Sequence, residues 1–264
     1  MSDPSRSAEP FLVAASLSGT ADADWARAAA PHVDVAVVGG IALDPASRAA
    51  ARDLVARERD EFLPDDPAAW IDRQLDRVAD APVRPGVNVR SATVDPIREA
   101  AAICADRDAV CEINAHCRQP ELRAVGFGES LLRDTDRLAA YVAAAAETGA
   151  RTSVKVRAEV PGVDLVAVAE AVTDAGADWL HVDAMDSEPV VAELTGRDLT
   201  VIANNGVRGR ETVAEYARYG ADAVSVGRPT EHPTALSRVA DAVAAWRDET
   251  LVGRDADPQP EASP

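Results

Sequence analysis

Eight short runs rich in β-branched and other apolar residues recur along the chain, and they constrain its fold more than any other feature. Each run has six to eight residues, with turn-forming residues nearby. Runs of this length and polarity are typical of strands buried in a parallel sheet. The predicted strands cover residues 11–16, 33–40, 83–89, 109–114, 152–157, 178–183, 199–204 and 222–227.

Amphipathic stretches separate the predicted strands and read as helices. The stretch 134–150 has Asp134 as a candidate N-cap and Gly149 near its end. The stretches 164–177 and 210–221 both close on Gly-Ala, a common left-handed stop before the next strand. The chain therefore alternates strand and helix over most of its length.

Eight strand–helix units predict an α/β fold, a (β/α)8 TIM barrel in a single domain over residues 11–250. The alternative is a doubly wound sheet, which often carries Gly-x-Gly-x-x-Gly after its first strand, and that motif is absent. Residues 1–10 and the acidic, proline-rich tail 251–264 are predicted to be disordered.

The charge composition indicates the salt environment of the protein and the kinds of partner it can bind. The chain has 45 acidic and 27 basic residues, a net charge of −18, and Lys155 as its only lysine. This composition indicates a halophilic protein, with an acidic protein from an ordinary environment as the alternative. It disfavours a broad phosphate-binding face for nucleic acid.

The location of the protein is expected to be cytoplasmic, without a membrane partner. Three cysteines in a chain of this size disfavour a disulfide framework. No apolar run is long enough to span a bilayer, and the N-terminal residues do not form a signal peptide. No Cys-x-x-Cys or His-x-x-x-His pair exists, so no metal site is expected.

Candidate site residues follow from the barrel, because TIM barrels place their active sites at the carboxyl ends of the strands. The loops after the seventh and eighth strands commonly hold phosphate, here at Asn204-Asn205-Gly206 and Gly227-Arg228. The alternative is that both glycines only form tight turns.

Two reactive side chains stand out near other strand ends. Lys155 interrupts a valine-rich strand and would place a compact positive charge at the barrel mouth. Its alternative role is a buried ion pair with a carboxylate. Cys117 lies three residues beyond Asn114 in the loop after the fourth strand, whereas Cys104 and Cys111 read as packing residues.

Several motifs, taken in order, resemble the dihydrouridine synthase family across residues 11 to 230, and more distantly dihydroorotate dehydrogenase. Archaeal dihydrouridine-synthase-like barrel proteins are the nearest likeness. The matching stretches are "ASLSGTAD" (15–22), "EINAHCRQPELRAVGFGESLLRD" (112–134), "SVKVR" (153–157), "LHVDAMD" (180–186), "VIANNGVRGRETV" (201–213) and "GADAVSVGR" (220–228).

The resemblance implies an FMN cofactor, with Lys155 near the flavin N1/O2 edge and Asn88 at the pyrimidine edge. Cys117 would be the catalytic acid that protonates a uracil-like ring, together with Lys155 beside the flavin. Asn114 and Arg157 would bind the substrate. The residues implied in cofactor binding are Ser16, Asn88, Lys155, His181, Asn204, Asn205, Gly206, Gly227 and Arg228.

The sequence also departs from the family pattern. His116-Cys117-Arg118 replaces the usual Gly-Cys-Pro, and His181-x-Asp183 replaces His-x-Arg. The helical domain with which the family grips tRNA is expected to be missing after the barrel.

The function expected from the resemblance is that of a flavin-dependent oxidoreductase acting on CH-CH groups. Its substrate would be uridine in tRNA or a free pyrimidine, and its electron donor NAD(P)H or another reductant. The alternative is a non-redox barrel that binds a phosphorylated ligand. A third reading is a lyase or isomerase that uses Lys155 as a Schiff base. The oligomeric state does not follow from the sequence.

Overall fold

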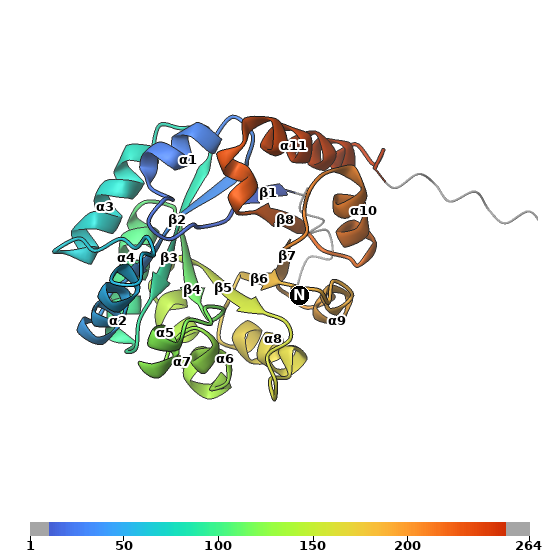
Figure 1. The fold of residues 1–264 in the computed structure, drawn as a ribbon. Coiled ribbons are helices and arrows are strands. Elements are labelled where there is room, and N and C mark those ends of the chain that lie inside the picture. Colours follow the sequence, from blue (N-terminus) through green and yellow to red (C-terminus); the bar gives the residue numbers. More distant parts are fainter. Residues whose placement is uncertain (1–10, 252–264) are drawn as a thin grey trace, which may run out of the picture.

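The structure, a computed structural model, describes residues 11–251 and forms a closed barrel of eight parallel strands (Figure 1). Each strand pairs with the next, and β1 closes the ring against β8 through pairs such as Val13 with Ser225. The strands are β1 Phe11–Ala14, β2 Val35–Ala42, β3 Arg84–Arg90, β4 Val110–Asn114, β5 Arg151–Arg157, β6 Trp179–Asp183, β7 Thr200–Asn204 and β8 Ala223–Val226. The predicted single-domain TIM barrel is confirmed.

Helices surround the strands and cover the outside of the barrel (Figure 1). They are α1 Ala23–Ala29, α2 Pro45–Val55, α3 Pro67–Val78, α4 Asp95–Asp106, α5 Pro120–Ala124, α6 Glu129–Leu132, α7 Thr135–Ala146, α8 Leu165–Asp174, α9 Val190–Leu194, α10 Arg210–Arg218 and α11 Pro233–Arg247. Asp134 caps α7 as predicted, because its carboxylate accepts a hydrogen bond from the backbone N–H of Arg137.

Side chains alternate along each strand between the barrel interior and the helix layer. On β4, Cys111 and Ile113 join the large apolar core between strands and helices. Val110 instead packs in a small apolar cluster with interior residues of other strands. Glu112 and Asn114 share the parity of Val110 and form hydrogen bonds across the interior. The interior is therefore apolar at one end and polar toward the carboxyl ends of the strands.

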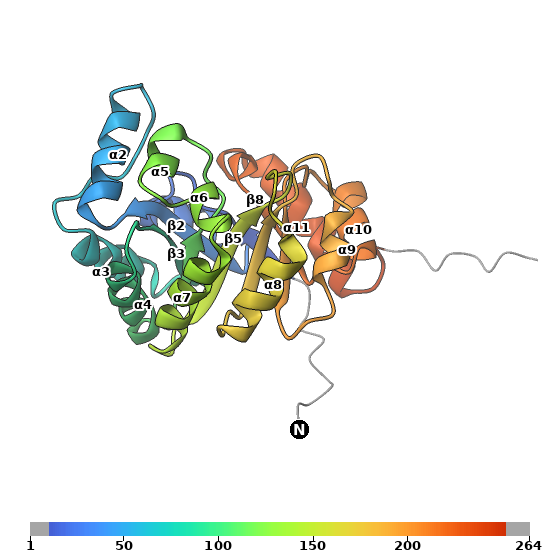
Figure 2. The same cartoon turned by 90° about the horizontal axis from the view of Figure 1, so that it is seen from below.

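The segment between α2 and α3, together with helices α2 and α5, forms part of the rim at that polar end. Residues 56–66 connect α2 to α3, and Phe62 forms an isolated bridge with Ile41. Gly19 packs so closely against this segment that a Cβ there would lie 2.3 Å from the Cβ of Asp60. Helices α2 and α5 rise together at the same end of the barrel in Figure 2.

The predicted disordered ends lie almost wholly outside the described residues, which exclude 1–10 and 252–264. Leu251, the first residue of the predicted tail, is buried against the core. Within residues 11–251, the helices are too short or too polar to cross a membrane.

The buried carboxylate of Asp44 ties two of the loops at the polar end together. It accepts hydrogen bonds from the backbone N–H groups of Ala46 and Ser47 at the start of α2. It also accepts from the Ser91 hydroxyl and the Ala92 N–H group at the end of β3. Burial alone would raise the pKa of Asp44, but these hydrogen bonds outweigh burial and lower it.

Replacing this cap should destabilise the barrel. We expect Asp44→Ala to lower the free energy of unfolding by about 2 kcal/mol, because five donors, the Ser47 hydroxyl among them, lose their acceptor. Asp66→Ala, at an exposed cap of α3 with one such bond, should lose less. The lowered pKa makes the Asp44 contribution complete above its ordinary pKa of 3.8 and smaller at lower pH. Denaturant titrations at pH values from about 3 to about 7 measure both the loss of stability and its dependence on pH. Equal losses in the two variants would contradict this account.

Candidate functional site

Glu112 stands at the centre of a polar layer inside the barrel. Its Oε1 accepts a hydrogen bond from the Asn88 side-chain amide at 2.8 Å. Its Oε2 lies 2.7 Å from His181 Nδ1 and accepts from the Ser153 hydroxyl at 3.3 Å. His181 Nε2 continues the network to Ser225 Oγ at 2.7 Å. The network joins β3, β4, β5, β6 and β8 in one layer.

Lys155 supplies the positive charge that balances this carboxylate. Burial alone would raise the pKa of Glu112, but His181, Lys155 and Asn88 together lower it to about 2. Burial and the Lys155 charge lower the pKa of His181, so its imidazole is neutral near pH 7. The Asn204 amide donates to His181 Nε2 at 3.2 Å, which places the imidazole proton on Nδ1, facing Glu112.

A second set of hydrogen bonds runs from this layer to the cysteine loop. The Asn114 amide donates to the Asn88 side-chain oxygen at 2.9 Å. Asn114 Oδ1 then accepts from the backbone N–H groups of His116 and Cys117, at 3.3 and 3.2 Å. Asn114 therefore fixes the backbone of the loop that carries the thiol.

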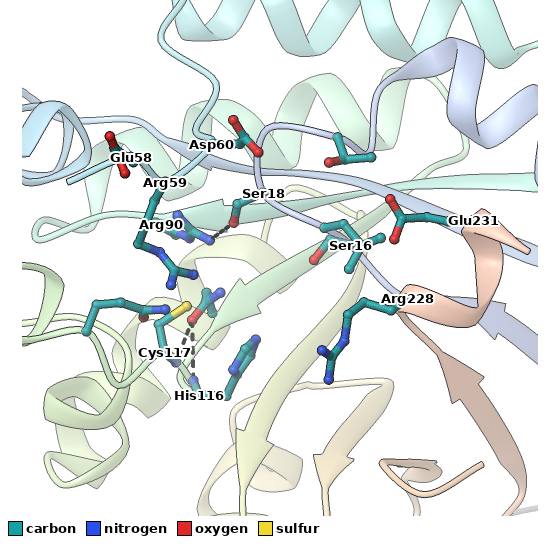
Figure 3. A pocket seen from close by; sticks show the side chains of 14 residues that line it. Ser16, Ser18, Glu58, Arg59, Asp60, Arg90, His116, Cys117, Arg228 and Glu231 are labelled. Atoms are coloured by element: carbon teal, nitrogen blue, oxygen red, sulfur yellow. Dashed lines mark hydrogen bonds between the residues drawn. The ribbon is translucent and has the colours of Figure 1, made fainter. Parts of the chain in front are cut away.

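Two adjoining cavities open above the polar layer. One, here called the β7/β8 cavity, has a volume of about 480 Å³ and lies beside the ends of β7 and β8. The other, the Cys117 cavity, has about 450 Å³ and lies beside the cysteine loop (Figure 3). Both volumes are typical of small-molecule sites, which span about 300–1,000 Å³. Ser16, Leu17, His116 and Arg228 line both cavities and so form their common wall.

Most of the residues predicted for a cofactor gather around the β7/β8 cavity. Its lining includes Ser16, Lys155, Asn204, Asn205, Gly206, Gly227 and Arg228. Asn88 and His181, also predicted for this role, are fully buried in the polar layer and line neither cavity. Their side chains bind Glu112 instead.

The turn after β7 has the geometry of a ligand cradle. Asn205 and Gly206 both have left-handed backbones, with φ of 88° and 64°. The Tyr216 hydroxyl, on α10, donates to the carbonyl of Asn205 at 2.9 Å and holds the turn from below. Burial raises the pKa of Tyr216, so the hydroxyl stays protonated and remains a donor.

Cys117 lies at the base of the Cys117 cavity and is 5% exposed. Leu54, Leu122 and Phe127 pack with it in a small apolar cluster beneath α2 and α5. The backbone at Gly128 passes directly over the loop, where a Cβ would lie 2.3 Å from the Cys117 carbonyl oxygen. The thiol therefore sits in a fixed, mostly dry position beside the cavity.

Arg90 provides the buried positive charge at this cavity. Its guanidinium pairs with Glu61 at 2.6 Å and also donates to Ser18. Burial alone would lower the pKa of Arg90, but interactions with Cys117 and Glu61 raise it. Burial, with the nearby cations Lys155 and Arg90, holds the pKa of His116 well below its usual range. The imidazole between the cavities is therefore neutral near pH 7.

Arg157, predicted to bind substrate, points elsewhere. Its guanidinium lies 3.4 Å from Glu129 Oε1 and 3.0 Å from the Met185 sulfur, and it lines neither cavity. Asn114, predicted for the same role, does line the Cys117 cavity.

Sequence reasoning missed Glu112, Arg90 and Glu61. Glu112 carried a usable signal, because a carboxylate within the apolar run "AVCEIN" is as unusual as the lysine within "SVKVR". The ion pair between Arg90 and Glu61 left no signal in the sequence, because it joins the end of a strand to a connecting segment distant in the sequence.

Comparison with known proteins identifies the family. The family model described as dihydrouridine synthase (Dus) matches residues 84–251, which is more than half of the chain. The chain belongs to the dihydrouridine synthase family. The resemblance predicted from the motifs is thus confirmed, and the matched range contains the cysteine loop, Lys155 and both candidate phosphate turns.

An archaeal relative matches most of the chain. An uncharacterized protein of Methanocaldococcus jannaschii is 29% identical over 229 residues, which cover 82% of this chain and 88% of the relative.

Solved structures share the fold at low sequence identity. The 3-hexulose-6-phosphate synthase of Salmonella typhimurium is 16% identical, with a TM-score of 0.55 over 91% of this chain and 99% of that one. The thiamine phosphate pyrophosphorylase of Pyrococcus furiosus is 11% identical, with a TM-score of 0.53 over 93% of this chain and 99% of that one. These two likenesses show the barrel fold alone.

Removing the central carboxylate should be costly. We expect Glu112→Gln to lower the free energy of unfolding by about 3–5 kcal/mol, because Lys155 loses its buried counter-charge. Glu170→Gln, which breaks a solvent-exposed pair with Arg197, should change the free energy of unfolding by less than about 1 kcal/mol.

The same pair of variants has a pH signature. Because the pKa of Glu112 is lowered from 4.5 to about 2, its contribution is complete above pH 4.5 and disappears as pH falls toward 2. Denaturant unfolding at several pH values measures the difference in the free energy of unfolding between wild type and Glu112→Gln. A gap that stays constant down to pH 2 would contradict the assignment of an ionised Glu112.

Proposed function

We propose that this protein is an FMN-dependent oxidoreductase that reduces the C5–C6 double bond of a uracil-like ring. One observation carries the proposal: the side chain of the only lysine lines the β7/β8 cavity beside the candidate phosphate turns. Within residues 11–251, no group accepts a hydrogen bond from Lys155 Nζ. Glu112 balances the charge of Lys155, but the N–H groups of Lys155 Nζ remain available to an electron-rich ligand in the cavity.

The residues around the β7/β8 cavity fit a flavin mononucleotide. The Asn205-Gly206 turn and Gly227-Arg228 would hold the phosphate through backbone N–H groups and one guanidinium. Lys155 would face the electron-poor end of the ring system and stabilise negative charge there. The bound flavin would supply hydride transfer, a step that protein side chains do not perform.

The Cys117 cavity would hold the ring to be reduced. His116 and Leu17, in the wall between the cavities, are the residues that would separate or align the two ligands. Cys117 would give its thiol proton to ring carbon C5, and Asn114 would hold the cysteine loop in place for that transfer. The electron donor in this proposal is NAD(P)H or another cellular reductant.

A second candidate function is a barrel that binds a phosphorylated ligand without redox chemistry. The same β7/β8 turns and Arg228 favour it, since they would hold any phosphate group. The two candidate functions differ in the role of Cys117. Its thiol is required for activity only in the first, where it transfers a proton to the ring.

Flavin binding and tuning test the first candidate. We expect the purified protein to bind FMN stoichiometrically and to show the visible absorbance of oxidised flavin. Lys155→Met should lower the reduction potential of the bound flavin by roughly 30 mV or more, because the reduced, anionic form loses its counter-charge. The control is Arg52→Met, which removes an exposed cation from α2. No flavin binding at any salt concentration would rule the proposal out.

Thiol removal tests the proton donor. With FMN bound, Cys117→Ala should lower the rate of ring reduction by about 10²–10⁴-fold, the usual contribution of a positioned acid. Cys104→Ala, which removes a thiol buried behind the strand layer, should retain the wild-type rate per folded protein. Anaerobic oxidation of the pre-reduced flavin by added substrate measures the rate. An unchanged rate in Cys117→Ala would assign the proton to another group.

A further inference from the structure

We infer that Arg90 is a further catalytic residue, whose guanidinium donates a hydrogen bond to the ring carbonyl oxygen at C4, next to the carbon that Cys117 protonates. This inference rests on the proposed function. It adds to that function the group that stabilises the negative charge formed in the ring during reduction.

Reduction of a uracil-like ring needs such a group. Hydride from the reduced flavin adds to C6, and the electron pair of the C5–C6 double bond moves toward C5 and the carbonyl at C4. The C4 oxygen carries this charge until the Cys117 thiol gives its proton to C5. The flavin is then oxidised by one electron pair, and the thiolate regains its proton from water. A donor fixed at the C4 oxygen lowers the barrier to this step.

Arg90 lies where that oxygen must come. It ends β3 and lines the Cys117 cavity together with Asn114 and Cys117. Its guanidinium interacts with the Cys117 sulfur, and both side chains are almost fully buried. The C4 carbonyl is bonded directly to C5, whereas the C2 carbonyl is on the other side of the ring. A donor beside the acid that serves C5 therefore meets the C4 oxygen.

The guanidinium is held in one position by three parts of the fold. Its Nη1 donates to Glu61 at 2.6 Å, and its Nη2 donates to Ser18 in the loop after β1. The backbone of Gly40 packs against it so closely that a Cβ there would lie 2.6 Å from Arg90 Nε. Figure 3 shows the bond to Ser18 and the Cys117 sulfur on the same side of the cavity, across from Arg228. A donor fixed in this way needs no reorganisation as charge develops.

Arg90 also retains N–H groups for a ligand. Glu61 and Ser18 accept from Nη1 and Nη2, and each of these nitrogens carries another N–H. The ion pair with Glu61 balances the charge of Arg90, so the pair suits a neutral carbonyl rather than a free anion. The same ring is recognised whether it is part of an RNA or a free nucleoside.

The other arginines of this cavity are less suited to the role. Arg59 is exposed to solvent, which weakens a hydrogen bond to a developing charge. Arg228 lines both cavities and has the flavin phosphate as its proposed partner. Arg90 is the buried one of the three, and its interactions with Cys117 and Glu61 raise its pKa, so it remains charged throughout the reaction.

The test uses probes that differ at a single ring oxygen. They are uridine, 4-thiouridine and 2-thiouridine, supplied as nucleosides and as the only pyrimidine of a short single-stranded oligoadenylate. Sulfur is a weak hydrogen-bond acceptor, so 4-thiouridine lacks the acceptor next to C5 and 2-thiouridine lacks the distant one. Anaerobic oxidation of the pre-reduced flavin in the FMN-loaded protein, at saturating probe, measures the maximal rate.

We expect Arg90→Met to lower the maximal rate with uridine by about 10²–10³-fold, the usual cost of losing one donor to a developing oxyanion. The loss with 4-thiouridine should be about tenfold smaller or less, because the wild type gains little from a bond to sulfur. The loss with 2-thiouridine should match the loss with uridine.

Two further comparisons separate this role from a structural one. Arg90→Met leaves the Glu61 carboxylate buried without its partner, so the double variant Arg90→Met/Glu61→Gln is compared with Glu61→Gln alone and should show the same pattern. Arg59→Met, which removes the exposed arginine of the same cavity, should keep the wild-type ratio of rates between uridine and 4-thiouridine.

Equal losses with uridine and 4-thiouridine on removal of Arg90 would overturn the inference and leave the proposed function intact. A loss that spares 2-thiouridine instead of 4-thiouridine would also overturn it, because Arg90 would then serve the other carbonyl. If the wild type binds FMN but reduces none of the probes, the proposed function itself fails and the inference falls with it.

Discussion

The ionised carboxylate of Glu112 holds the inner surface of the barrel mouth in one arrangement. It is buried, so its charge must be balanced and its oxygens must accept hydrogen bonds. Lys155 supplies the opposite charge, while Asn88, Ser153 and His181 supply the hydrogen bonds. Both cavities lie above this layer, and the chain from Asn88 through Asn114 to the cysteine loop carries its geometry to the rim.

This arrangement explains how one barrel can support two neighbouring sites with different chemistry. The β7/β8 side has glycine-containing turns and a lysine, and it is suited to a phosphate and an electron-rich ring. The Cys117 side has a dry thiol, a neutral imidazole and guanidiniums held by separate elements. In the proposed function, this common wall would separate the flavin in the β7/β8 cavity from the ring beside Cys117.

Strand positions could be predicted from the sequence because each buried strand is short, apolar and followed by turn residues. The predicted strand ends agree with the structure to within two residues. The predicted end of β4 also separated Cys117, in the loop beyond the strand, from Cys111, which lies within the strand and faces the helix layer. The family resemblance added the roles that position alone does not give.

Pairings across the mouth could not be predicted in the same way. Arg90 and Glu61 are neighbours only because segment 56–66 returns to the rim and packs on Gly19, a contact between segments far apart in the sequence. Arg157 was assigned to substrate by its motif, yet its local neighbours Glu129 and Met185 bind its guanidinium. Asn88 and His181 were placed beside the cofactor by analogy, and the balance of charge around Glu112 holds them one layer deeper.

The most direct test of the account is a crystal structure of the protein with FMN and a uracil-type ligand. The account predicts flavin phosphate on the Asn205-Gly206 and Gly227-Arg228 turns, the flavin ring against Lys155, and the second ring beside Cys117. FMN outside the β7/β8 cavity, or a uracil-type ring far from Cys117, would contradict it.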